Sequence, residues 1–349
     1  MSYTNGLDKP SDYFNTKLYA GNNGTQSITG IGFAPDWVWI KNRDTTDNNV
    51  LYDTVRGVQK RLISNNTDAE ATKTNGLTAF GSDGFSLGSA GESNDNNLVS
   101  WNWKAGTSFT NDASGTGIGT IDSTGSVNTD AGFSIISYTG NGSAGATVAH
   151  GLGAVPKMII FKRRGSGGWN VYHAGIGNTK SISLNTDQPT DTDIAYWNNT
   201  TPTSSVFSLG TSAAGNGNGN SMISYCFAEK QGYSKFGSYT GNGSATDGTF
   251  IYTGFKPAWL VAKRTNDTGA WYTVDNKRDT FNVTHKWLDL DSSDAENTSS
   301  AALNVDFLSN GFKNRTSNNS RNGSGQSYIY MAFAENPFTT STGIPATAK

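Results

Sequence analysis

The sequence predicts an all-β protein made of three tandem β-sandwiches, of the jelly-roll or concanavalin-like type, with roughly 100 residues in each. Short stretches rich in Val, Ile, Tyr, Phe and Trp alternate with clusters of Gly, Asn, Asp and Ser, which is typical of strands joined by turns. No window keeps the apolar spacing of an amphipathic helix. The phrase SYTGNGSA occurs at 137–144 and again at 238–245, which indicates internal duplication.

A second phrase shows that the unit is present three times. A Pro, five residues and a Lys occur as PDWVWIK (35–41), PKMIIFK (156–162) and PAWLVAK (257–263). Further phrases follow each of these in one fixed order, which shared composition alone would not preserve. They are VLYDT (50–54), WNVYH (169–173) and WYTVD (271–275); KRLISNNTDAE (60–70), KSISLNTDQPT (180–190) and KWLDLDSSDAE (286–296); GFSLG (84–88), VFSLG (206–210) and GFKNR (311–315); and NNLVSWNWKAG (96–106), NSMISYCFAEK (220–230) and QSYIYMAFAEN (326–336).

The phrases PKMIIFK and PAWLVAK are continuous apolar runs bounded by Pro and Lys. They predict central strands that are buried on both faces, with the Pro at the strand start where no ladder donor is needed. The Asn-Gly pairs at 141–142 and 242–243 predict tight turns, because both residues tolerate positive φ.

The order of the phrases sets the expected domain boundaries. Each sandwich is expected to have its own hydrophobic core, and the second and third, joined almost without a spacer, to pack in a fixed relation. The predicted parts are an N-terminal arm (1–10), the first sandwich (11–106), a polar linker with at most one hairpin (107–130), the second sandwich (131–230), the third sandwich (231–338) and an extended C-terminal tail (339–349).

Composition excludes several classes of function. Among 349 residues, 26 Lys and Arg nearly balance 28 Asp and Glu, so the chain lacks the basic surface of a nucleic-acid or membrane-surface binder. Charged residues are only 15%, and neutral polar residues replace them. The 9 Trp, 14 Tyr and 17 Phe argue for packed cores rather than disorder.

Compartment signals are few. Cys226 is the single cysteine, so no intrachain disulfide can form. The first residues, MSYTNGLDKPSDYFNT, have neither a basic nor an apolar region of a secretory signal. No apolar run is long enough to span a bilayer. We therefore expect synthesis in a cytoplasm without insertion into a membrane.

No catalytic or metal-binding pattern stands out. His150, His173 and His285 fall at different phrases and lack metal-ligand spacing, and no G-x-S-x-G motif is present, so structural roles are expected for them. Paired carboxylates could serve a glycosidase, and the candidates are Asp68 with Glu70 and Asp294 with Glu296. We assign them to the repeated fold, and we expect no enzyme activity, no cofactor and no metal.

The acidic stretch Asp289–Glu296 leaves one alternative open. Four acids in eight residues supply oxygen ligands that suit calcium, yet the spacing differs from that of an EF-hand loop and its central Gly is missing. A solvated loop and a calcium site both remain possible interpretations of this segment.

Aromatic residues give the candidate contact site. Tyr196 and Trp197 lie in the polar phrase IAYWNNTTP, which has no aromatic counterpart in the other copies. A feature confined to one copy is not required by the shared fold, so this pair is the candidate for contact with a glycan, a neighbouring domain or a partner. Trp169 and Trp271 occupy a repeated phrase and are assigned to the core.

These elements, from YTGNGS through DAE and GFSLG to AFAENPF and GIPATAK, resemble the repeat-containing virion structural proteins of tailed bacteriophages, particularly marine ones, often described as tail-fibre proteins. The resemblance extends from Tyr13 to the end of the chain. It implies a concanavalin-like or jelly-roll fold and a place on the particle surface, and it brings no catalytic motif. The chain lacks the heptads of a long fibre.

We therefore expect a non-enzymatic virion component, in the tail or a tail fibre, that contacts the host surface. Its expected partners are other virion proteins, further copies of itself and host glycans. A capsid-decorating or connector protein is the alternative within the same particle. A carbohydrate-active enzyme with lectin-like domains is the alternative from another class.

Overall fold

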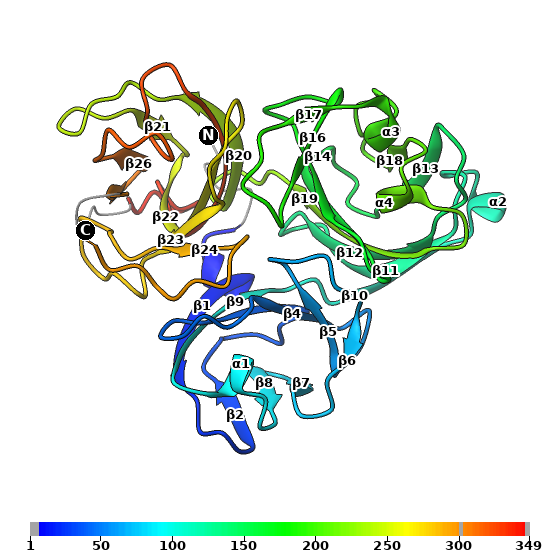
Figure 1. Cartoon of the computed structure of the whole chain (residues 1–349), viewed down its shortest axis with the longest axis horizontal. Helices are drawn as coiled ribbons and strands as arrows, with labels where there is room; N and C mark the ends of the chain where they lie inside the picture. Colours follow the sequence, from blue (N-terminus) through cyan, green and yellow to red (C-terminus); the bar gives the residue numbers. More distant parts are fainter. Residues whose placement is uncertain (1–6, 300–302, 346–349) are drawn as a thin grey trace.

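The computed structural model describes residues 7–299 and 303–345. Its strands form three lobes around a common centre, with the first lobe at the bottom, the second at the right and the third at the upper left in Figure 1. Every strand pair within the sheets is antiparallel, and the four α-helices have four residues each, which confirms the all-β prediction. Among the described residues, no helix is long and apolar enough to cross a membrane.

The first lobe contains a six-stranded sheet in the order β1-β9-β3-β4-β5-β6 and a three-stranded sheet in the order β2-β8-β7. Its elements are η1 (Pro10–Asp12), β1 (Phe14–Ala20), β2 (Gln26–Thr29), β3 (Trp37–Asn42), β4 (Val50–Asp53), β5 (Lys60–Ile63), β6 (Ala71–Thr72), β7 (Leu77–Gly81), β8 (Gly84–Leu87), α1 (Gly91–Asn94) and β9 (Asn97–Trp103).

The second lobe contains an eight-stranded sheet in the order β10-β11-β12-β19-β14-β15-β16-β17 and the two-stranded sheet β13-β18. Its elements are β10 (Thr107–Asn111), α2 (Ala113–Thr116), β11 (Ser123–Asn128), β12 (Phe133–Thr139), β13 (Ala146–Ala149), β14 (Pro156–Arg163), β15 (Trp169–His173), β16 (Lys180–Ser183), β17 (Asp191–Thr192), α3 (Ile194–Trp197), β18 (Val206–Leu209), α4 (Ala213–Asn216) and β19 (Ser221–Ala228).

The third lobe contains a five-stranded sheet in the order β20-β27-β22-β23-β24 and a three-stranded sheet in the order β21-β26-β25. Its elements are β20 (Ser234–Thr240), β21 (Phe250–Tyr252), β22 (Phe255–Arg264), β23 (Tyr272–Asp275), β24 (Leu288–Asp289), β25 (Val305–Leu308), β26 (Gly311–Asn314) and β27 (Ser327–Pro337).

The segment 107–130 differs from the expected polar linker. It forms β10 and β11, and β11 pairs with β12 along its whole length. The segment therefore belongs to the large sheet of the second lobe. Its polar residues gave the impression of a linker because the pair lies at the edge of a sheet, where one face and one border meet water.

The three lobes share one arrangement of strands. The last strand of each lobe pairs on one side with β1, β12 or β20 and on the other side with the strand of the Pro-to-Lys phrase: β9 lies between β1 and β3, β19 between β12 and β14, and β27 between β20 and β22. The registers correspond, because Trp37 lies opposite Trp103, Met158 opposite Phe227 and Trp259 opposite Phe333. The strands predicted from PKMIIFK and PAWLVAK are confirmed as β14 and β22.

Alternation along these central strands explains why they are apolar on both faces. In β3, Val38 and Ile40 pack in a cluster between the large and small sheets of the first lobe. Trp37 and Trp39, which point the opposite way, pack toward the other lobes. The second and third lobes have equivalent clusters between their own sheets.

Besides the cluster inside each lobe, a central cluster joins the three lobes, which the expectation of separate cores did not include. The inward faces of all three large sheets meet in one apolar cluster, in which the ring of Trp37 lies 4.4 Å from that of Tyr225 and the ring of Trp103 lies 5.4 Å from that of Trp259. A lobe on its own would expose this face to water, so burial of these large rings stabilises the assembly of the lobes rather than any one of them.

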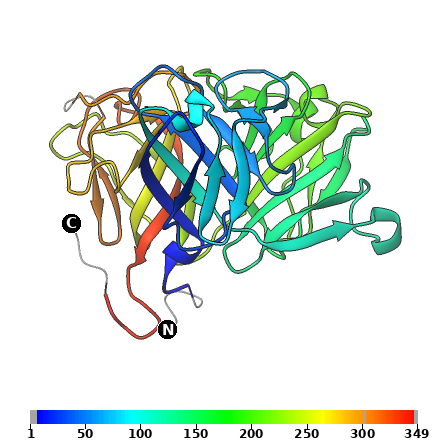
Figure 2. The same cartoon turned by 90° about the horizontal axis from the view of Figure 1, so that it is seen from below.

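The first and last described segments, near Asp8 and Ser341, lie side by side at the bottom of Figure 2. Residues 1–6 of the predicted N-terminal arm lie outside the described residues, whereas Leu7 packs into the central cluster. The tail is irregular rather than simply extended, since Thr339 bridges to Pro345 and the main-chain N–H of Ser341 donates to Asp8 at 2.7 Å. Residues 346–349 of the tail lie outside the described part of the chain.

Candidate functional site: the lobe junctions and an exposed loop

The lysine of each Pro-to-Lys phrase is fully buried. Burial lowers the pKa of Lys41, Lys162 and Lys263 to about 8. Each ammonium group donates to main-chain carbonyls of loops, and two of them reach a neighbouring lobe. Lys41 donates to Ser293 at 2.8 Å, and Lys263 donates to Asp187 at 2.8 Å. These lysines therefore tie loops together at the junctions between lobes.

The junction of the first and second lobes holds a closed set of charges. Glu70 accepts two hydrogen bonds from the guanidinium of Arg164, at 2.9 and 2.7 Å, and a third from Arg56 at 3.3 Å. Arg56 also pairs with Asp53 at 2.5 Å, and Asp53 accepts from the hydroxyl of Tyr225 at 2.7 Å. Two residues of the second lobe thus bind two acids of the first.

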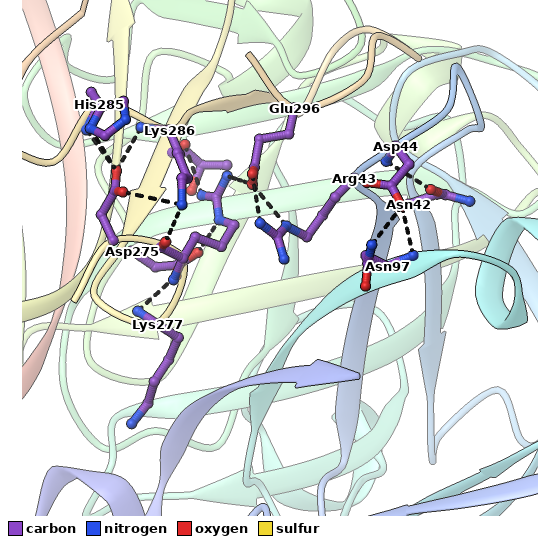
Figure 3. A network of polar contacts seen from close by, with 12 residues as sticks. Asn42, Arg43, Asp44, Asn97, Asp275, Lys277, His285, Lys286 and Glu296 are labelled. Atoms are coloured by element: carbon purple, nitrogen blue, oxygen red, sulfur yellow. Dashed lines mark hydrogen bonds and ion pairs between the residues drawn. The ribbon is translucent and has the colours of Figure 1, made fainter. Parts of the chain in front are cut away.

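The junction of the third and first lobes repeats this set, as Figure 3 shows. Glu296 accepts from Arg43 at 2.9 and 2.7 Å and from Arg278 at 3.2 Å. Arg278 pairs with Asp275 at 2.6 Å, and the indole N–H of Trp101 donates to Asp275 at 3.2 Å. Because the contacts are the same as at the first junction, the two junctions are equivalent.

At the junction of the second and third lobes, all four positions that carry charges at the other two junctions are occupied by other residues. Counting along the repeated phrases places Thr190 at the position of Glu70, Thr265 at that of Arg164, and Ile176 at that of Arg56. The main-chain N–H of Thr190 still donates to Thr265 at 2.9 Å, so the backbone contact remains. His173 replaces the aspartate and donates from Nε2 to the carbonyl of Tyr330 at 3.1 Å. Neutral groups thus replace all four charges together.

These contacts account for the two glutamates of the glycosidase candidates, Glu70 and Glu296, whereas Asp68 and Asp294, among the described residues, bond only residues two positions before them. Burial alone would raise the pKa of Glu70, but the hydrogen bonds and charges of Arg164 and Arg56 hold it below its ordinary value. Glu296 is bound in the same way at the other junction. A general acid needs a raised pKa, whereas the pKa of Glu70 is lowered.

The acidic stretch Asp289–Glu296 is packed against the first lobe instead of forming an open loop. The side chain of Asn49 donates to the carbonyl of Asp289 at 3.2 Å, and Asp291 accepts from the main chain of Trp271 at 2.9 Å. Burial raises the pKa of Asp289 to about 7 and that of Asp291 to about 6. Within residues 7–299 and 303–345, no group of three His, Cys, Asp or Glu side chains is placed to hold a metal ion.

Two of the three histidines are internal. His150 accepts from the main chain of Leu152 at 3.2 Å, and His173 accepts from that of Gly175 at 3.0 Å. Burial lowers the pKa of both imidazoles to about 4. They act as neutral hydrogen-bonding groups that fix turns.

The candidate contact pair does not lie on the surface as expected. Trp197 is 1% exposed and packs against Phe161 and Tyr172, with ring separations of 4.9 and 5.5 Å. Tyr196 is half-buried beside the same cluster. The pair belongs to a short helix, α3, whose apolar side closes the core of the second lobe, so Trp197 cannot contact a ligand in this conformation.

The assignment of Trp169 and Trp271 to the core is confirmed. Both are buried, and their indole N–H groups donate across lobe junctions, to the carbonyls of Ile63 at 2.7 Å and Ser183 at 2.8 Å. Asn49 takes the equivalent position in the first lobe. These tryptophans therefore bind neighbouring lobes rather than only their own.

The most exposed large apolar side chain in the described structure is Phe281, at 77%. It lies in the loop 279–285, beside a hollow of about 540 Å³ that Asn282, His285 and Lys286 help to line. This loop is specific to the third lobe. Seven residues separate Arg278 from Lys286, whereas three separate the equivalent residues of the other two lobes.

The loop is held at its base and its middle. Asp279 accepts from the main-chain N–H groups of His285 and Lys286, both at 2.7 Å. The side-chain amide of Asn282 exchanges two hydrogen bonds of 2.9 Å with the main chain of Phe307 in β25. The exposed ring of Phe281 is therefore presented by a loop that is anchored at its base and its middle, and His285 and Lys286 at the end of this loop lie near Glu296 in Figure 3.

Sequence reasoning missed this loop, although a signal was present. The spacing between the repeated phrases is longer by four residues in the third copy only. Tyr196 and Trp197 stand out as an aromatic pair in one copy, whereas Phe281 is a single aromatic residue whose only signal is the four-residue insertion.

The fold and these contacts define an all-β protein whose junction charges join the lobes and whose loop 279–285 presents an aromatic ring. The chain belongs to the family described as Domain of unknown function (DUF7483), whose model matches residues 9–337. No curated protein and no solved structure matches the chain.

Proposed function

We propose that this chain is a non-enzymatic structural component of a bacteriophage particle, in the tail or a tail fibre, that contacts the host surface. The proposal places it on the virion surface with other virion proteins and further copies of the chain as partners. The observation that carries it is the use of the junction charges. The acids and bases that recur in the repeated phrases bind lobe to lobe, which is expected of a rigid scaffold.

We further propose that the three lobes are copies of one β-sandwich. Support comes from matched positions in the small sheets, where Ile28 lies opposite Phe85, Val148 opposite Phe207 and Ile251 opposite Phe312. Each pair belongs to the cluster between the large and small sheet of its lobe. Strands and clusters that correspond in this way are expected of a duplicated unit with diverged loops.

We propose that the chain contacts the host surface through the loop 279–285, and not through Tyr196 and Trp197. An exposed aromatic ring can stack on the C–H face of a sugar, and the imidazole and ammonium groups of His285 and Lys286 can donate to hydroxyls. The anchored base of the loop means that little ordering is needed on binding, which favours affinity.

The direct test is a density map of the intact particle together with glycan binding by the purified chain. The proposal predicts a three-lobed density on the tail, and binding to a host glycan that Phe281→Ala abolishes. Phe250→Ala, which removes another exposed ring of the third lobe, is the matched control and should leave glycan binding unchanged.

Other outcomes would overturn the proposal. Density on the capsid would identify a decorating or connector protein instead. Hydrolysis of a host polysaccharide by the purified chain would contradict the non-enzymatic assignment. Absence of the chain from the particle would contradict the virion assignment as a whole.

A further inference from the structure

The strand β21 is an open edge of the small sheet in the third lobe. The sheet has the order β21-β26-β25, so β21 has a partner on one side only. Ile251 points into the core and is 7% exposed, whereas Phe250 and Tyr252 point outward and are 45% and 59% exposed. An exposed edge with apolar side chains is a template for pairing with another strand.

The hydrogen-bond register shows which backbone groups are available. Asn314 donates to the carbonyl of Thr249 at 3.0 Å, and Thr253 donates to that of Asn310 at 3.0 Å. In an antiparallel pair, alternate residues bond the partner strand and the residues between them face away. The main-chain groups of Phe250 and Tyr252 therefore point away from β26, toward the open side.

The second lobe shows what covers the same edge there. Its equivalent strand is β13, in which Thr147 and Ala149 alternate with the core residue Val148, and Ala149 is buried there at 2% exposure. The segment Thr120–Ser123 runs parallel to β13, with Ile121 bridged to Val148. Thr120 and Ile121 donate to the carbonyl of Thr147 at 2.9 and 3.1 Å, Thr147 donates back to the hydroxyl of Thr120 at 2.8 Å, and Ser123 donates to Ala149 at 3.0 Å.

Among the residues that the structure describes, no segment of the third lobe takes this role. The covering segment of the second lobe lies in the stretch between β10 and β12, but only five residues separate β19 from β20. No hydrogen bond to the main chain of Phe250 or Tyr252 from the open side occurs within residues 7–299 and 303–345. The side chains at these two positions also differ, since Thr147 and Ala149 of the second lobe correspond to two aromatic rings here.

We propose that β21 is a strand-addition site for an extended segment of a partner protein, bound parallel to β21 as Thr120–Ser123 is bound to β13. The segment that fits has small polar and branched side chains, because that chemistry covers the same edge in the second lobe. The rings of Phe250 and Tyr252 add apolar contact that β13 lacks. Main-chain hydrogen bonds give the affinity in such a site, and the rings give selectivity. This inference does not depend on the proposed function.

The test uses the full chain and a synthetic peptide with the sequence of residues 117–124, GIGTIDST. Hydrogen exchange of the Phe250 and Tyr252 amides should slow at least tenfold in the presence of the peptide. The amide of Thr147 is the internal reference, because its site is already filled, and its exchange should stay constant.

Variants separate edge pairing from loss of folding. Phe250→Pro removes an N–H that β26 does not use, and should abolish peptide binding while circular dichroism stays unchanged. Phe250→Thr copies Thr147 and keeps the N–H, so it should weaken binding only several-fold. Ser27→Pro, at the equivalent position of β2 in the first lobe, is the matched control and should bind as the unaltered chain does.

Three results would overturn the inference. One is binding that survives Phe250→Pro. Another is a slower exchange at Thr147 and not at Phe250, which would mean that the peptide replaces the chain's own segment. The third is concentration-dependent self-association that Phe250→Pro removes, since the occupant would then be a second copy of this chain.

Discussion

The charged junctions make a sharp prediction about the pair Arg43 and Glu296. The side chain of Glu296 is 5% exposed and that of Arg278, which it also binds, is 0% exposed. Glu296→Thr leaves the largely buried guanidinium of Arg43 without its carboxylate, and leaves Arg278 with Asp275 alone. Removing one partner of a buried ion pair costs about 3–5 kcal/mol of unfolding free energy.

The neutral junction between the second and third lobes indicates how the loss can be offset. There, Thr190 and Thr265 occupy the positions of Glu296 and Arg43 with the backbone contact intact. The double variant Arg43→Thr/Glu296→Thr copies that pair. We expect it to cost less than the sum of the single variants, by a coupling energy of about 2 kcal/mol, because no unpaired Arg43 remains.

The assay is urea unfolding of the four proteins of this cycle, with the transition midpoint and slope measured for each. The exposed pair Lys313 and Asp247 is the matched control, and its cycle should give a coupling too small to measure. Additive effects at Arg43 and Glu296 would refute the view that the junction charges act as a set.

Three further predictions follow from buried groups. Trp37→Ala should cost about 3–5 kcal/mol of unfolding free energy, measured in urea, because it empties the centre shared by the lobes. Burial raises the pKa of Asp289 from its ordinary value of 3.8 to about 7. Between pH 4 and pH 7, Asp289 therefore binds a proton in the folded chain and releases it when the chain unfolds. The stability of the unaltered chain relative to Asp289→Asn should therefore fall as pH rises from 4 to 7, and a flat difference curve would contradict this. The difference is needed because buried His150 and His173, with pKa values of about 4, change stability in the opposite direction over this range. Burial raises the pKa of Cys226 to about 12, so a thiol reagent should label it only in denaturant, and rapid labelling of the folded chain would show that its surroundings are open.

Much of the fold could be predicted because the repeated phrases carry local information. Asn-Gly pairs and apolar runs between Pro and Lys depend on backbone geometry and strand alternation, which act within a few residues. The same local information identifies the lysines of the Pro-to-Lys phrases, Lys41, Lys162 and Lys263. Their role at the junctions could not be predicted, because a buried ammonium group is unusual and depends on carbonyls from another lobe.

The shared core could not be predicted from the strand pattern. Residues 37–40 are apolar on both faces, and the sequence does not distinguish the face of Val38, which meets the small sheet, from that of Trp37, which meets other lobes. The same ambiguity affected Trp197, where an aromatic residue in a polar phrase proved to be the buried side of a short helix.

One part of the site was present in the sequence as a correlation. Glu70 and Glu296 end the phrases 60–70 and 286–296, and the lobe that follows each of them around the centre has an Arg two residues after the lysine of its Pro-to-Lys phrase. The phrase 180–190 ends in Thr190 instead, and the lobe that follows it has Thr265 at the position of that Arg. Comparing the copies with one another, position by position, would have predicted the junctions. The order of the lobes around the centre determines which Glu meets which Arg, and this order could not be predicted from the sequence.

The central claim is that the three lobes surround a shared core and act as one body. Differential scanning calorimetry of the whole chain tests this most directly. We predict a single transition whose calorimetric and van't Hoff enthalpies agree. Two or three resolved transitions, each with its own enthalpy, would show that the lobes fold independently and would contradict the claim.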